Sequence, residues 1–137
     1  MDSFAAYSHA LAAVAGWGLL MVVLSGLSLK GRTPENRAEC GLPKRNYAEP
    51  SYRTHRAYAN AIESSTPFLT GVLVCVLMGA SPFWVNLFAS VFLVARIAMA
   101  YVHIATENQN ARSATYGISW VCMIALGVMA LIAAFTG

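Results

Sequence analysis

Residues 114–135 read ATYGISWVCMIALGVMALIAAF and contain no acidic or basic side chain. A helix rises 1.5 Å per residue, so about 20 apolar residues cross the roughly 30 Å of hydrocarbon in a bilayer. This stretch is therefore predicted to be a transmembrane helix.

The composition of the rest of the chain also favours a membrane. Its 137 residues are 58% hydrophobic and 11% charged, with a mean hydropathy of +0.56, whereas soluble domains carry about 25% charged residues. A soluble globule of this length would still expose roughly a third of its surface to water. These values exclude an ordinary soluble domain.

Three further segments are long and apolar enough to span the bilayer. The four predicted spans cover about residues 4–29, 53–80, 83–105 and 112–135. We therefore expect an all-α integral membrane protein built as a four-helix bundle. The first span is expected to remain in the mature protein, because the N-terminus lacks the basic region of a cleaved signal peptide.

Charged residues gather in the first connection and its flanks. Eleven of the fifteen Lys, Arg, Asp and Glu residues lie between Lys30 and Glu63. Because basic residues beside spans mark the cytoplasmic side, we predict that the 30–52 loop and the short 106–111 connection are cytoplasmic and that both termini face the opposite side. Basic and aromatic residues do not alternate as single-stranded nucleic acid would require, so nucleic-acid binding is not expected.

The three cysteines, Cys40, Cys75 and Cys122, show no metal-binding or disulfide spacing. The first lies in the polar loop and the other two lie in apolar spans. Each is interpreted as a structural residue, and no metal site is predicted.

A polar stripe follows one face of the second span, because its members recur at steps of three or four residues. They are Arg53, Arg56, Asn60, Glu63 and Pro67. Such a face is expected to contact protein or water rather than lipid.

Arg96 lies roughly 15 Å inside the membrane from the cytoplasmic end of the third span, where an unpaired charge costs several kcal/mol. Glu63 lies at a similar depth on the second span. We therefore predict an ion pair between Glu63 and Arg96, with either a structural or a ligand-binding role.

Similar spacing joins polar residues on the third and fourth spans. The third contributes Arg96, Met99 or Ala100, His103 and Glu107, and the fourth contributes Arg112, Thr115 or Tyr116, and Ser119. Guanidinium groups beside amides and hydroxyls suggest a cytoplasmic-side pocket for an anionic, amide-rich small molecule. Taken singly, His103 would be interpreted as a packed histidine, and Tyr101 and Tyr116 as interfacial or core aromatics.

The stretch Arg56-Ala-Tyr-Ala-Asn60-Ala-Ile-Glu63, followed by Pro67-Phe68, resembles the R-A-x-x-N-x-x-E signature of the MAPEG family, the membrane-associated proteins in eicosanoid and glutathione metabolism. Leu93 to Arg96 and Arg112-Ser113-Ala-Thr-Tyr116 are similar to the third and fourth helices of the prostaglandin E synthases in that family. The resemblance begins at about Arg53 and continues to the end. Residues 1–137 are then expected to form one MAPEG-like transmembrane domain.

The resemblance implies a homotrimer with three sites between neighbouring subunits. Each site would hold glutathione, as co-substrate or cofactor, near the cytoplasmic face, while a lipophilic substrate arrives through the membrane lipids. By position, the resemblance implies that Arg56, Asn60 and Glu63 hold glutathione, with Arg53 supporting them. The other residues implied at the glutathione site are Arg96, Tyr116 and either His103 or Tyr101. It also implies that Arg112 and Ser113 are catalytic residues at the glutathione sulfur.

Three positions depart from the prostaglandin E synthases: Ala59 replaces an arginine, Met99 a histidine and His103 a tyrosine. We therefore expect a glutathione transferase or peroxidase that acts on lipophilic electrophiles or lipid hydroperoxides. The alternatives are a non-catalytic lipid-presenting protein, as in the lipoxygenase-activating branch of the family, and a small channel or transporter. Arg112 favours the enzyme, since a lipid carrier needs no cation at the thiol.

Overall fold

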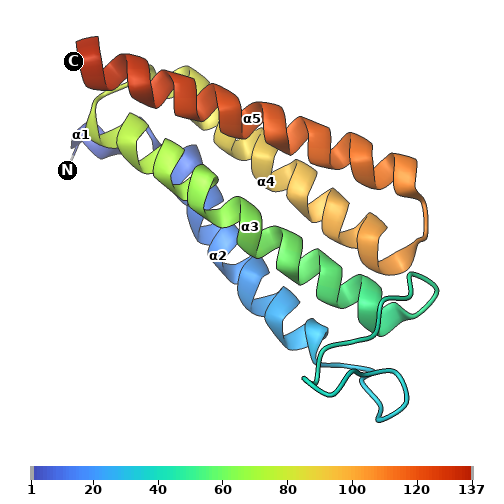
Figure 1. Cartoon of the computed structure of the whole chain (residues 1–137). Helices are drawn as coiled ribbons and strands as arrows, with labels where there is room; N and C mark the ends of the chain where they lie inside the picture. The colour runs from blue at the N-terminus through green and yellow to red at the C-terminus, as the bar shows by residue number, and fades with distance from the viewer. Residues whose placement is uncertain (1, 137) are drawn as a thin grey trace.

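The computed structural model describes residues 2–136 and is a bundle of long helices (Figure 1). A short helix α1 (Asp2–Ala5) is followed by α2 (Ser8–Ser28), α3 (Pro50–Leu77), α4 (Pro82–Ala105) and α5 (Gln109–Thr136). All four long helices have the length and hydropathy of a membrane span. The prediction of an all-α, multi-pass membrane protein is confirmed.

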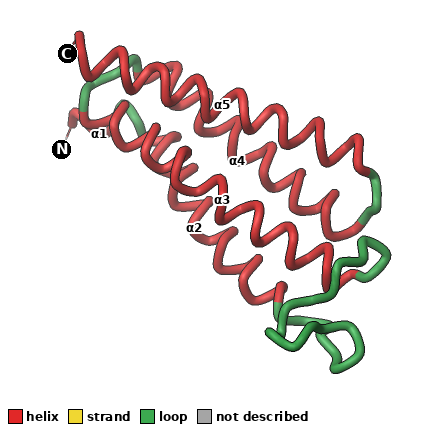
Figure 2. Tube along the Cα trace, viewed as in Figure 1, coloured by secondary structure: helices red, strands yellow, loops and turns green. Residues whose placement is uncertain are grey.

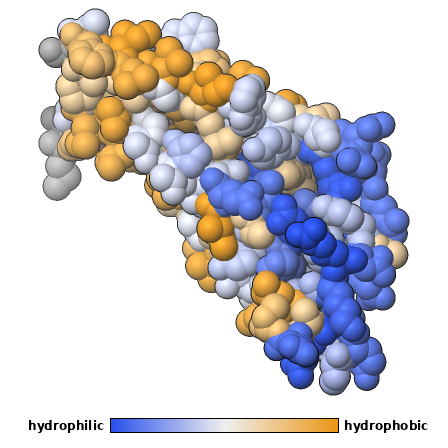
Figure 3. Space-filling model, viewed as in Figure 1, coloured by the Kyte–Doolittle hydropathy of each residue, from blue (hydrophilic) through white to orange (hydrophobic). Residues whose placement is uncertain are grey.

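The connections divide between the two ends of the bundle (Figure 2). The long loop 29–49 and the short loop 106–108 lie at one end, and both termini lie at the other with the tight turn 78–81. Hydrophilic surface covers the first end and hydrophobic surface the second (Figure 3). We call these the charged end and the apolar end; the cytoplasmic location of the charged end stays a prediction.

Helix α3 begins at Pro50, three residues before the predicted start of the second span. Proline is well suited to the first helical position, because its fixed φ matches the helix and its missing N–H would be unpaired there anyway. Arg53 therefore lies inside the helix rather than at its start.

The first span was predicted as one helix from about residue 4, but the helix is interrupted at residues 6–7 and α2 begins at Ser8. Asn86 of α4 stabilises the interruption. Its side-chain oxygen accepts a hydrogen bond from the Ala10 N–H at 2.8 Å, and its amide donates to the Ala6 carbonyl at 2.8 Å. Periodicity alone does not show a break that depends on a side chain from another helix.

Aromatic residues from three helices fill the centre of the bundle. Trp17 of α2 packs edge to face against Phe68 of α3 and Phe92 of α4, with ring centroids 6.2 and 5.1 Å apart. The Trp17 indole N–H also donates to Ser65 Oγ at 3.0 Å. In lipid, helix association depends on such close packing and interhelical hydrogen bonds, because apolar burial alone gives little preference over lipid tails.

Gly71 allows α3 and α5 to approach closely. A Cβ atom at this position would lie 3.0 Å from the Leu126 Cβ, so a small residue is needed here. This contact holds together the two helices that carry most of the predicted site.

Candidate functional site

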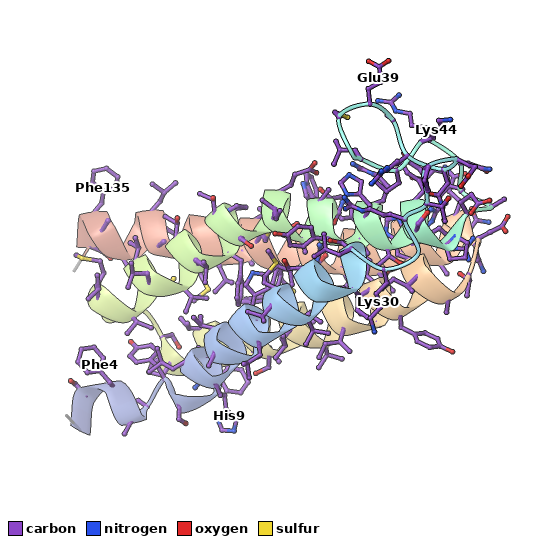
Figure 4. All side chains as sticks on the ribbon, turned by 90° about the horizontal axis from the view of Figure 1, so that it is seen from below. Phe4, His9, Lys30, Glu39, Lys44 and Phe135 are labelled. Atoms are coloured by element: carbon purple, nitrogen blue, oxygen red, sulfur yellow. The ribbon has the colours of Figure 1, made fainter. Side chains whose placement is uncertain are left out.

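The predicted site residues lie at the charged end. Side chains rich in nitrogen and oxygen crowd there beneath the long loop that carries Lys44, while carbon dominates near Phe135 (Figure 4). The polar stripes of α3, α4 and α5 therefore lie in the same half of the bundle, nearest the charged end.

Arg96 is buried and binds to neighbours on three other helices. Its Nη2 donates to Asn60 Oδ1 at 2.7 Å, and its Nη1 donates to Met99 Sδ at 3.2 Å. The guanidinium also lies over the Trp17 ring, at 5.4 Å, and near the Tyr116 ring, at 6.0 Å. Cation–π contacts of this kind stabilise a desolvated guanidinium.

The predicted ion pair between Glu63 and Arg96 is wrong within the single chain. Within residues 2–136 one ion pair is formed, between Arg53 and Glu107, and the Glu63 side chain is exposed. The rotation of α3 explains the difference, because it directs Asn60 towards Arg96 and turns Glu63 outwards.

Glu63 instead lines a groove of about 270 Å³ on the outer surface, between α3 and α5. Ser64 and Tyr116 add polar groups to this groove, while Pro67 and Trp120 add apolar walls. An exposed carboxylate at this depth is costly in lipid, so a neighbouring chain or a ligand is expected to cover it.

Arg53 fixes the long loop to the bundle. Its Nη1 donates to the carbonyls of Tyr47 and Ala48, at 2.6 and 3.0 Å, and its Nε donates to the Ile104 carbonyl at 3.1 Å. Glu107 lies 3.7 Å from the same guanidinium. Arg53 thus has a structural role in placing the loop, and its part in glutathione binding stays a prediction.

Arg112 and His103 both contact the ring of Tyr47, a loop residue. The Arg112 guanidinium is 4.3 Å from the centre of the Tyr47 ring, and the His103 imidazole stacks on that ring at 6.3 Å. Both ring nitrogens of His103 and Nη1 of Arg112 are buried and have no hydrogen-bond partner within residues 2–136. The two His103 ring nitrogens and Arg112 Nη1 are therefore free, within residues 2–136, to form hydrogen bonds with a ligand.

The remaining predicted site residues point outwards. Ser113 is exposed next to Arg112, Tyr116 is 37% exposed, and Tyr101 is 71% exposed. Two residues of α4 were predicted as alternatives for contact with glutathione. His103 stacks on the Tyr47 ring, which Arg112 also contacts, whereas the Tyr101 side chain is exposed.

Arg56 lines a second pocket, of about 430 Å³, together with Arg45, His55, Tyr47 and Tyr52. Tyr47, Arg45 and His55 were not among the site residues predicted from the sequence. Two of them lie on or near the loop, where no helical spacing relates one residue to another, and only the folded loop brings them to α3.

The sequence profile of the MAPEG family matches residues 4–132. None of the curated proteins matches the chain in sequence. The matched range contains the four long helices up to the last turn of α5, and every predicted site residue. The chain belongs to the MAPEG family.

Proposed function

We propose that the protein binds glutathione at the charged end and uses its thiol against lipophilic electrophiles or lipid hydroperoxides. Arg112 carries this proposal, because its Nη1 is buried and has no hydrogen-bond partner within residues 2–136. MAPEG proteins are mostly glutathione-dependent enzymes, although non-enzymatic members exist. The non-enzymatic alternative is a lipid-presenting protein.

The two ends of glutathione match the polar stripe of α3. Glutathione has two carboxylates and one ammonium group. Arg56 offers a guanidinium to a carboxylate, which it can contact through two parallel hydrogen bonds, and the exposed Glu63 offers a carboxylate to the ammonium. Since Asn60 Oδ1 already accepts from Arg96, the Asn60 amide N–H groups are left to donate to the peptide carbonyls of glutathione.

Arg112 would then stabilise the thiolate. A thiol with a pKa of about 8.5 is mostly protonated at neutral pH, and a cation within about 4–6 Å lowers that pKa by roughly 1–3 units. Tyr47 now lies against the Arg112 guanidinium at 4.3 Å. The ring therefore has to move for the sulfur to approach that face of the cation.

Both reactions use the sulfur as a nucleophile. With an aryl halide, a carbon–sulfur bond forms, the carbon–halogen bond breaks, halide leaves and the thiol proton passes to water. With a lipid hydroperoxide, sulfur takes the terminal oxygen as the oxygen–oxygen bond breaks, which yields the alcohol and glutathione sulfenic acid. A second glutathione converts the sulfenic acid to the disulfide and water.

The groove beside Glu63 and Tyr116 opens on the outer surface, towards lipid. We infer that a neighbouring subunit covers this groove in a homotrimer and that the lipophilic substrate enters it from the bilayer. Covering Glu63 with protein would remove the cost of exposing its carboxylate to lipid.

The test is glutathione titration of the purified protein, followed by turnover with an aryl halide and with a lipid hydroperoxide. Wild-type protein should show the ultraviolet absorbance of bound thiolate. Arg112→Leu should retain much of the affinity but lose this absorbance and nearly all turnover. Arg37→Leu is the matched control, because Arg37 is exposed in the loop and lines neither pocket.

Two results would contradict the proposal. Absence of glutathione binding by the wild-type protein would favour the lipid-presenting alternative. Normal thiolate absorbance and turnover in Arg112→Leu would show that another group activates the sulfur.

A further inference from the structure

A basic pocket lies between the long loop and the first turns of α3. It encloses about 430 Å³, and its polar lining includes Arg45, His55 and Arg56. Leu42 and Pro43 form an apolar wall. None of the described residues that line it is acidic.

The cations of this pocket are not neutralised by the chain. Arg45 and Arg56 form no side-chain hydrogen bond or ion pair with any residue from 2 to 136, and His55 Nδ1 is buried without a partner. Arg32 and Arg53, in the same part of the molecule, instead donate to backbone carbonyls. Arg45 and Arg56 thus remain unpaired at this cavity, while the neighbouring Arg32 and Arg53 hold the loop in place.

The surroundings of the pocket suit the surface of a membrane. It lies at the charged end, between the long loop and the first residues of α3. Leu42 is 46% exposed and Tyr47 is 42% exposed, and an exposed leucine and tyrosine beside basic residues are typical of a segment at the level of lipid head groups.

We propose that this pocket binds a phosphate group, either that of an anionic phospholipid at the membrane surface or that of a soluble phosphate. A guanidinium group binds phosphate oxygens through parallel hydrogen bonds. Glutathione, as placed in the proposed function, does not use the rest of this pocket, because it extends from Arg56 towards Glu63, which lies outside the pocket. The inference shares Arg56 with the proposed function, but Arg45 and His55 have no part in that function.

The experiment compares the whole protein in nanodiscs of phosphatidylcholine with and without phosphatidylglycerol. Native mass spectrometry measures which lipid stays bound. Wild type should retain phosphatidylglycerol, and Arg45→Gln should lose about tenfold in this preference, as expected for one charge-assisted hydrogen bond. His55→Ala should cause a smaller loss, and the control Arg37→Gln, which removes the same charge from the same loop, should behave as wild type.

A second arm identifies the source of the phosphate. Phosphorus NMR with inorganic phosphate, in phosphatidylcholine nanodiscs, should show line broadening that Arg45→Gln removes if soluble phosphate binds. Glutathione affinity, measured on the same samples, should be unchanged in Arg45→Gln. If glutathione does not bind wild type but the lipid preference remains, the proposed function fails and the phosphate site stands.

Two outcomes would overturn the inference. Equal behaviour of Arg45→Gln and Arg37→Gln in both arms would show that no specific phosphate site exists. A loss of glutathione affinity in Arg45→Gln, with lipid and phosphate binding unchanged, would show that the pocket holds a glutathione carboxylate.

Discussion

The two ends of the bundle satisfy their polar groups in different ways. At the apolar end, Asn86 forms hydrogen bonds with the backbone on both sides of the helix break, and the Tyr7 hydroxyl donates to the Ala80 carbonyl. At the charged end lie all the buried side-chain nitrogens that lack partners within residues 2–136; they belong to His55, His103 and Arg112.

This difference separates structural polar groups from groups with spare binding capacity. Inside a membrane, an unsatisfied polar group is costly, so a stable fold pairs it internally. Groups left unpaired at one end only are candidates for contact with a ligand. The following predictions test that separation.

The largest effect is expected at Asn60, whose side-chain oxygen accepts a hydrogen bond from the buried Arg96. Asn60→Leu removes the acceptor of a buried guanidinium and should lower the stability of the ligand-free protein by about 1.5–3 kcal/mol. Adding Arg96→Leu should restore part of the loss, because the stranded charge disappears. Unfolding in mixed detergent measures both variants; strict additivity would show that the Asn60–Arg96 hydrogen bond does not contribute.

A smaller loss is expected at the apolar end. Asn86→Leu removes two hydrogen bonds to backbone groups and should lower stability by about 1 kcal/mol, since interhelical hydrogen bonds in membranes contribute modestly. Glutathione affinity should not change, because Asn86 lies at the other end of α4 from His103. An altered affinity at unchanged stability would contradict the division between the two ends.

Tyr47→Ala should expose Arg112. Losing a cation–π contact of about 0.5–1 kcal/mol should raise glutathione affinity roughly two- to fivefold, because that contact no longer competes with the ligand. Modification of Arg112 by phenylglyoxal, followed by mass spectrometry, should also become faster. Tyr47→Phe is the control and should match wild type in both measurements; equal Arg112 reactivity in wild type and Tyr47→Ala would show that the ring does not shield the cation.

Ser113→Ala should have the smallest effect. The side chain is exposed, so stability should stay within about 0.5 kcal/mol of wild type. Turnover should fall a few-fold, as expected for the loss of one hydrogen bond to the sulfur. Steady-state kinetics with an aryl halide measures this loss, and unchanged kinetics would remove Ser113 from the proposed catalytic pair.

Local sequence patterns were enough to predict the four spans, the end at which the charges gather and the spacing of Arg56, Asn60 and Glu63 along one side of a helix. Hydropathy and the 3.6-residue period are local properties, so they can be read without knowing how the helices pack. The family signature could be recognised for the same reason, because its residues lie on one helix at fixed spacing.

Which of these residues contact one another depends on how the helices and the loop pack together. Asn60 and Glu63 differ by only about 60° around the helix axis, so a modest rotation of α3 determines which one reaches Arg96. Tyr47 reaches Arg112 because Arg53 holds the loop against α4, and a loop has no period from which its path follows. Side-chain partners therefore depend on helix rotation and loop path, which are set by packing across the whole bundle rather than by local spacing.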